Sequence, residues 1–272
     1  VRQDSVDRHR LGCLMPVTRI ATAQTSALLA GNLTSHTIDR AVNVNPTAGP
    51  YVYGIVLYGF TADVALTSDP VTCTWTGGTP VALLASPLLF GSSMNMLMGW
   101  IVENPVSGTV QVSHMGIGTS TWAKARFLTV GVWSQAQQLD LVNIQSAVVS
   151  AVGSSNVTSH TVTVPSILPA SRVIAGHLVG RGKKITAYNG TKVAAANSAG
   201  TPNSPTGNGQ MILGECRGAA SVDSTVTQSP STGLWATFGL NIDPAPVVFG
   251  AKGTHKAGKG SFGASVYRFA EP

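Results

Sequence analysis

The sequence predicts an all-β protein made of two tandem antiparallel β-sandwich domains. Three observations point to this fold class. Residues 32–38 (NLTSHTI) return in the second half of the chain as residues 156–162 (NVTSHTV). Short runs rich in Val, Thr and aromatic residues alternate with turns that contain Gly or Pro. Only 10% of the 272 residues are charged, against about 25% in an ordinary soluble domain, and long helical Glu/Lys/Leu patterns are missing.

The repeat sets the predicted domain boundaries. Further matches keep the same order along the chain: 75–82 with 188–194, 98–100 with 213–215, and 120–123 with 231–236. A repeat this long fits two copies of a whole domain, because solenoid repeats are shorter. We therefore expect an extended arm over 1–17, one sandwich over 18–134, a second over 135–246 and a Gly/Lys-rich docking tail over 247–272. The polar stretch 134–138 predicts the linker.

Residue patterns predict the strands of the first copy in order. Residues 34–38 alternate, as a half-buried strand does. Residues 51–60 are continuously apolar, which predicts a central strand covered on both faces. Residues 71–75 alternate into Gly77-Gly78, which predicts a hairpin with the apolar run 81–84. The remaining predicted strands are 96–102, 109–113 and 126–133, with 158–164 in the second copy. The stretches 21–30 and 141–152 fit either a short helix or a strand, and we favour a strand.

Basic residues gather at the two ends of the chain, whose formal net charge is +6. Basic tails can bind nucleic acid. Because these ends lack a dense basic run, partner docking is favoured over a nucleic-acid partner. The tail aromatics have no period that would bury them in their own domain. The predicted docking residues are Arg2, Arg8 and Arg10 in the arm, Trp133 near the linker, and Phe249, Lys252, Lys256, Lys259, Phe262, Tyr267 and Phe269 in the tail.

The sequence offers no converging set of catalytic or metal-binding residues. His36 and His160 occupy the same place in the two copies, yet each lies in a Thr/Ser-rich strand without a second metal ligand in the pattern beside it. No Gly-x-Ser-x-Gly motif occurs, and of the 11 acids only Glu103 and Glu215 fall in strand-rich stretches. The three cysteines have no redox or metal spacing, which predicts buried free thiols. We expect no catalytic residue, no metal and no cofactor, and therefore no enzyme.

Membrane association is not expected. The longest apolar run, residues 51–60, is too short to span a bilayer, and the first residues do not form a signal-peptide pattern.

Residues 75–113 resemble a jelly-roll-type sandwich that recurs in structural proteins of tailed bacteriophages. In that group a Gly-Gly-x-x-Leu turn precedes a strand leading into Trp-x-Leu-x-x-Pro-x-Gly-x-x-x-Val-x-Val. This chain supplies, in that order, Gly77-Gly78, Leu83, Trp100, Asn104-Pro105, Gly108, Val110 and Val112. The second copy keeps a turn at Asn189-Gly190, but Glu215-Cys216-Arg217 replaces the Trp-Ile-Val core.

The resemblance implies two jelly-roll-like domains in a non-enzymatic structural protein of the virion. A minor tail protein is the first expectation, with other virion proteins as partners and a homo-oligomer in the particle. A capsid-surface decoration protein is the closest alternative. A host-glycan-binding adhesin module and a small-virus capsid subunit are further alternatives.

Overall fold

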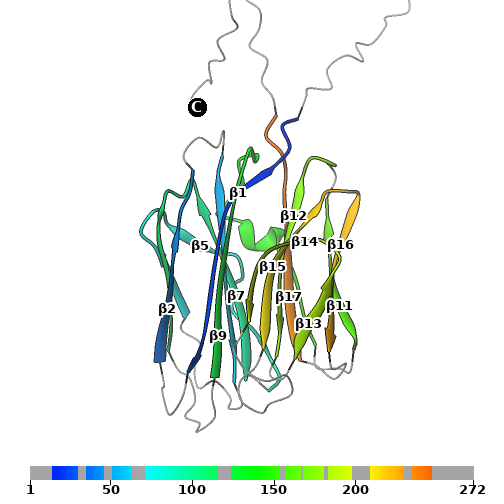
Figure 1. The fold of residues 1–272 in the computed structure, drawn as a ribbon. Helices are drawn as coiled ribbons and strands as arrows, with labels where there is room; N and C mark the ends of the chain where they lie inside the picture. The colour runs from blue at the N-terminus through cyan, green and yellow to red at the C-terminus, as the bar shows by residue number, and fades with distance from the viewer. Residues whose placement is uncertain are drawn as a thin grey trace, which may run out of the picture.

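The computed structural model is an all-β protein built from four antiparallel sheets (Figure 1). It describes residues 14–29, 35–45, 51–62, 66, 71–92, 94–115, 124–153, 157–166, 168–180, 183–197, 209–229 and 234–246. The predicted all-β class is confirmed, with sheets packed as in a β-sandwich. Within these ranges, no helix has the length and apolar character needed to cross a membrane.

The first half of the chain forms a large and a small sheet. The large sheet has the strand order β1–β9–β3–β7–β5, with β6 also paired to β7, and the small sheet has the order β2–β8–β4. The bounds are β1 Thr18–Leu29, β2 Ser35–Val42, β3 Tyr53–Thr61, β4 Val71–Trp75, β5 Pro80–Ala82, β6 Leu88–Phe90, β7 Asn95–Glu103, β8 Gly108–Met115 and β9 Lys124–Ser134.

The second half repeats this strand order. Its large sheet runs β10–β17–β12–β15–β14 and its small sheet β11–β16–β13. The bounds are β10 Val149–Gly153, β11 Ser159–Pro165, β12 Arg172–Val179, β13 Lys184–Tyr188, β14 Thr191–Asn197, β15 Gln210–Arg217, β16 Ser221–Ser229 and β17 Trp235–Ile242, with a 3-10 helix over Ile144–Ala147. With β6 set aside, each strand holds the position of its counterpart, which supports a duplication. Division into two tandem domains stays a prediction.

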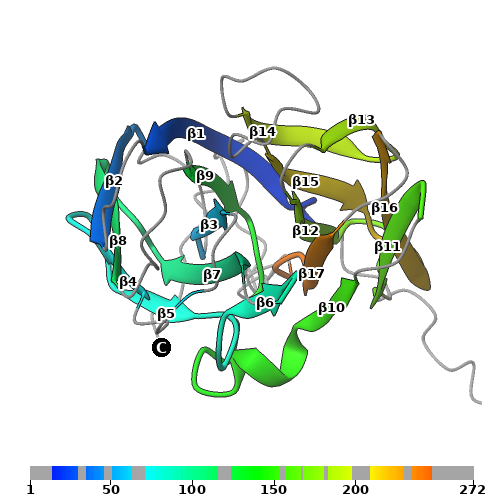
Figure 2. The same cartoon turned by 90° about the horizontal axis from the view of Figure 1, so that it is seen from below.

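The four sheets stack as layers, with the large sheets in the middle and the small sheets outside (Figure 2). Glycines let the two large sheets approach closely. A Cβ at Gly99 of β7 would lie 2.6 Å from Cζ of Phe238, and one at Gly176 of β12 would lie 2.8 Å from Cδ1 of Leu57. The largest core cluster accordingly contains buried side chains from both halves. The two halves therefore share one core.

Strand β3 is buried along its whole length, as its continuous apolar run predicts. Successive residues face different layers. A Cβ at Gly54 would meet Trp75 of the small sheet, whereas a Cβ at Gly59 would meet Leu178 and Met211 of the second half. Because both faces are covered, no polar alternation appears in this segment.

The hairpin predicted for residues 71–84 is wrong. β4 pairs with β8 in the small sheet, whereas β5 pairs with β7 in the large sheet. The turn between them carries the chain from one layer to the next. Gly77 is required in this turn, because a Cβ there would lie 2.2 Å from the carbonyl oxygen of Val106.

The predicted linker is held in the fold by backbone hydrogen bonds. The amide of Ala136, which is fully buried, donates to the carbonyl of Tyr51 at 3.3 Å. The amide of Gln137 donates to Asp243, and the amide of Ala245 donates to Gln135. Polar composition predicted a free segment, but these residues connect the two halves. Of the two undecided stretches, 21–29 lies within β1, and 141–152 contains the 3-10 helix and most of β10.

Candidate functional site

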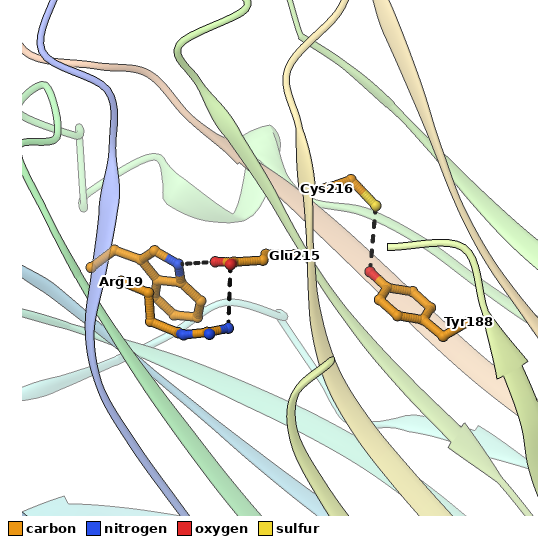
Figure 3. A network of polar contacts seen from close by, with 5 residues as sticks. Arg19, Tyr188, Glu215 and Cys216 are labelled. Carbon is orange, nitrogen blue, oxygen red and sulfur yellow. Dashed lines mark hydrogen bonds and ion pairs between the residues drawn. The ribbon is translucent and has the colours of Figure 1, made fainter. Parts of the chain in front are cut away.

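A carboxylate of the second half holds two side chains of the first half. The indole Nε1 of Trp133 donates to Oε2 of Glu215 at 2.7 Å, and Nη1 of Arg19 donates to Oε1 at 3.2 Å (Figure 3). Trp133 is fully buried, and β9, β15 and β1 position the three groups. The carboxylate thus links the two large sheets.

Side chains of β1 also form hydrogen bonds with backbone groups of the edge strand β14. The backbone amide of Ala195 donates to Oε1 of Gln24 at 2.6 Å, and the hydroxyl of Ser26 donates to the carbonyl of Asn197. An edge strand presents unpaired amides and carbonyls to any strand that approaches it. Here β1 provides partners for two of those groups, so β14 is protected within the chain.

A histidine–tyrosine cluster lies between the two sheets of the first half. The phenol oxygen of Tyr58 is 2.8 Å from Nε2 of His36 and 2.9 Å from Nδ1 of His114. A phenol has one proton, so it donates to one imidazole and accepts from the other. His36 and His114 are opposite each other on β2 and β8. The ring of Phe60 stacks on His36 with centroids 5.6 Å apart.

Burial keeps His114 and Tyr58 of this cluster neutral. Burial lowers the pKa of His114 to about 4 and raises the pKa of Tyr58 well above its ordinary value. The guanidinium of Arg126 opposes the second shift by favouring the phenolate, but burial is the larger cause. His114 and Tyr58 are fully buried. A neutral, enclosed set of side chains suits structural hydrogen bonding better than proton transfer with a substrate.

The second half has a different cluster around His177, the buried counterpart of Tyr58. One 2.9 Å hydrogen bond joins its Nε2 to the Ser224 hydroxyl, and another joins its Nδ1 to the Thr237 hydroxyl. The phenol of Tyr188 continues the chain to Ser224 at 3.2 Å. The same phenol lies 3.5 Å from the thiol of Cys216 (Figure 3). Burial, and then the charge of His160, lower the pKa of His177 well below its ordinary value.

His160 is held mainly by aromatic stacking. Its ring lies parallel to that of Trp235, with centroids 4.6 Å apart and an interplanar angle of 5°. Among the described residues, neither ring nitrogen of His160 has a hydrogen-bond partner. Burial lowers the pKa of His160 to about 4. The imidazole is therefore neutral at ordinary pH and packs through its ring face.

The sequence analysis missed the partners of the repeated histidines. His114 on β8 lies opposite His36 on the neighbouring strand β2. The rings of His177 and His160 lie 5.5 Å apart. Both partners are far from the repeated heptapeptide in sequence, so spacing along the chain did not reveal them. The alternation of residues 108–115 was the available signal, because it places His114 on the inward face.

Both ends of the described chain lie at one end of the molecule (Figure 1). Leu14, within the predicted arm (1–17), forms an isolated antiparallel bridge with Pro246, which precedes the tail. A hydrogen bond of 3.2 Å from the amide of Val17 to the carbonyl of Ala170 also attaches the start of this region to the second half. The arm and the tail are therefore attached side by side.

The structure describes only one of the predicted docking residues. Trp133 is fully buried between the halves, because its indole bonds to Glu215 and its ring packs over Gly131. This corrects the expectation that it docks an external partner, since the interface it occupies is internal. The other ten lie outside the described residues: Arg2, Arg8, Arg10, Phe249, Lys252, Lys256, Lys259, Phe262, Tyr267 and Phe269.

Comparisons of the chain with family models, with curated proteins and with solved structures found no match. Within the described ranges, no group of three or more His, Cys, Asp or Glu side chains is arranged to hold a metal ion. Cys73 and Cys216 are free thiols, and burial raises the pKa of Cys73 to about 12.

Proposed function

We propose that this chain is a non-enzymatic structural component of a tailed-phage virion, most simply a minor tail protein. It acts through protein–protein contacts with other virion proteins and with copies of itself. The observation that carries the proposal is the Leu14–Pro246 bridge, which brings the arm and the tail to one end of a molecule built from stacked sheets. That end can anchor the protein while the opposite end projects from the particle.

The non-enzymatic part of the proposal is supported by the enclosure of the titratable clusters. His114, His177 and Tyr58 are fully buried, and burial disfavours the charged form of each. A general base or nucleophile has to reach its substrate. These groups instead join the sheets of each half.

The phage origin rests on the resemblance of residues 75–113 to jelly-roll-type phage proteins. Two contacts account for features of that segment in physical terms. The indole of Trp75 donates to the carbonyl of Val106 at 3.1 Å, and the amide of Val106 donates to Gly77 at 2.8 Å. The turn motif and the Asn-Pro turn therefore form one unit, which is the part that the resemblance covers.

Immunogold labelling of particles of the phage that encodes this chain tests the proposal. Labelling of the tail is the expected result, and labelling of the head surface favours the decoration alternative. A particle preparation without the protein overturns both. Host-glycan binding by the purified chain favours the adhesin alternative, and cleavage of a glycan contradicts the non-enzymatic assignment.

A chain shortened by residues 247–272 tests the anchoring end separately. We expect it to keep the melting temperature of the full chain but to fail to enter particles, because the removed tail supplies aromatic and basic groups for docking. A shortened chain that is unfolded shows instead that the tail belongs to the second core. Normal incorporation contradicts anchoring through the tail.

A further inference from the structure

The two small sheets are attached to their large sheets in different ways. In the first half, buried side chains of the small sheet, among them Ile38 and Val112, belong to the largest core cluster. In the second half, the apolar contacts of the small sheet β11–β16–β13 form two separate clusters. One contains Val162, Val164, Val173, Ala175 and Val222, and the other contains Val179, Ile185, Ile212 and Val226. This small sheet is therefore not part of the core that the two halves share.

A polar layer separates these two clusters. On β12, His177 lies between Ala175 and Val179 on one face, because alternate residues of a strand face the same side. On β16, Ser224 has the same place between valines of the two clusters. The 2.9 Å hydrogen bond between His177 and Ser224 joins the small sheet to the large one. The middle of this sandwich is thus held by polar contacts.

The polar layer contains two imidazoles close to each other. The ring centroids of His160 and His177 are 5.5 Å apart. The other titratable groups of the layer are the phenol of Tyr188, whose ring centroid is 5.7 Å from that of His177, and the thiol of Cys216 beside that phenol. Burial raises the pKa of Tyr188, so the phenol is neutral. Two protonated imidazoles at this separation would repel each other.

The charged side chains of the surrounding strands do not face this layer. Glu215 of β15 is on the opposite face of the large sheet, where it binds Trp133 and Arg19. Asp223 of β16 is on the outer face, where it accepts a hydrogen bond from Thr163. The basic residues of these strands are exposed or lie at a strand end: Arg172, Lys184, Lys192 and Arg217. A proton on either imidazole would therefore be a buried charge without a counter-ion in the described strands.

The two halves differ in how they accommodate an added proton. A protonated imidazole donates from both ring nitrogens. In the part of the chain that the structure describes, neither nitrogen of His160 has a hydrogen-bond partner, and the ring stacks on Trp235. In the first half, the phenol oxygen of Tyr58 lies within 2.9 Å of a nitrogen of each histidine and can accept from a protonated ring. The second half is thus the more sensitive to acid.

We propose that the second half contains an acid-operated opening, in which protonation of His160 and His177 releases the small sheet β11–β16–β13 from the large sheet. The first half and the core between the large sheets stay folded. Release lets water reach both imidazoles and exposes the apolar inner face of the small sheet, including Val162 and Val226. The inference goes beyond the proposed function and does not depend on the place of the protein in a particle.

Proton uptake sets the pH dependence of the opening. Burial lowers the pKa of His160 to about 4 and the pKa of His177 well below its ordinary value. In the open state both values should return to about 6.5. Below pH 6.5 the open state therefore binds protons that the closed state excludes, and opening becomes more favourable as the pH falls. The opening constant should rise about tenfold per pH unit for each histidine, and about 100-fold for the two together.

Hydrogen exchange of the full chain between pH 5.5 and pH 4.5, followed by mass spectrometry, tests the proposal. After correction for the pH dependence of chemical exchange, we expect the opening constant of β11, β13 and β16 to rise about 100-fold over this range. Strands β3 and β12 should stay protected. His160→Phe keeps an aromatic ring against Trp235, and it should reduce the rise to about tenfold. His114→Gln, in the first half, is the matched control and should leave the rise unchanged.

Three results overturn the proposal. One is a loss of protection in all four sheets together, which shows that acid unfolds the whole chain. Another is an equal rise in the small sheet β2–β8–β4 of the first half. The third is an unchanged rise in the His160 variant. If that variant melts at a lower temperature than the unmodified chain at pH 7, His177→Gln takes its place. Its amide can bond to Ser224 and Thr237, and the same tenfold rise is expected.

Discussion

The indole nitrogen of Trp133 donates a 2.7 Å hydrogen bond to the carboxylate of Glu215, across the boundary between the two repeated halves. The indole is fully buried, and the side chain of Glu215 is only 14% exposed. Arg19 supplies the opposite charge from a third strand. A polar group at this depth is tolerated because each of its oxygens has a partner.

Replacing Glu215 should separate the hydrogen bond from the ion pair. Glu215→Ala leaves the buried indole N–H without an acceptor, and we expect the free energy of unfolding to fall by about 1–3 kcal/mol. Glu215→Gln keeps an acceptor and loses only the partly exposed ion pair with Arg19, so the expected cost is about 0–1 kcal/mol. Urea unfolding of both variants measures the difference. Equal losses would show that the Trp133 bond contributes nothing.

Adding a methyl group between the large sheets should be destabilising. Gly99→Ala places a Cβ 2.6 Å from the ring of Phe238, and overpacking of this kind costs about 1–3 kcal/mol. Phe238→Leu should relieve part of that cost. The double variant, measured by urea unfolding, is therefore expected to be less destabilised than the sum of the two single variants. Additive effects would mean that the sheets can separate freely at this point.

Acid should destabilise the fold between about pH 6.5 and pH 4. The pKa of His114 and of His160 is lowered from 6.5 to about 4 by burial. Above pH 6.5 both rings are neutral in the folded and unfolded states, so their effect on stability is constant. Between the two values the unfolded state binds protons that the folded state excludes. The free energy of unfolding should fall by about 1.4 kcal/mol per pH unit for each histidine.

Urea unfolding at a series of pH values checks this dependence. The variant His114→Gln/His160→Gln removes both titrating rings, and its stability should fall less steeply over the same range. Burial also lowers the pKa of His177, so a residual slope is expected in the variant. An unchanged slope would show that other groups cause the acid sensitivity.

Each half expressed alone should expose the apolar layer that the halves share. In a fragment of residues 14–134, Leu57 and Leu97 would become exposed to solvent. In a fragment of residues 135–246, Phe238 would become exposed. We expect both fragments to bind a hydrophobic dye strongly and the full chain to bind it weakly. Two fragments that melt cooperatively as soluble monomers would establish two independent domains instead.

Local patterns predicted strands well but not the sheets to which they belong. The run 51–60 indicated a doubly covered strand because burial on both faces leaves only apolar residues. The turn at Gly77 was mistaken for a hairpin because its sequence does not specify the next strand's partner. That partner is β7, and a Cβ at Gly78 would meet Val102 of β7.

The polar contacts between distant strands could not be predicted from one sequence. Glu215 had no ligand or base near it in the chain, and its partners Trp133 and Arg19 come from other strands. Likewise, His36 acquires Tyr58 and His114 only when strand register is known. Composition predicts that such groups are few. Only the pairing of strands shows which of them meet.

Strand β1 has consequences for the order of folding. Thr18 and Ser134, at the end of its pairing with β9, are 116 residues apart, and Gln24 caps an amide 171 residues away. During synthesis β1 therefore leaves the ribosome long before its partners exist. Closing loops of this length is slow, and an unpaired strand is prone to associate with other chains. We therefore expect β1 to stay unpaired until β9 has been synthesised, and its contact with β14 to form later still.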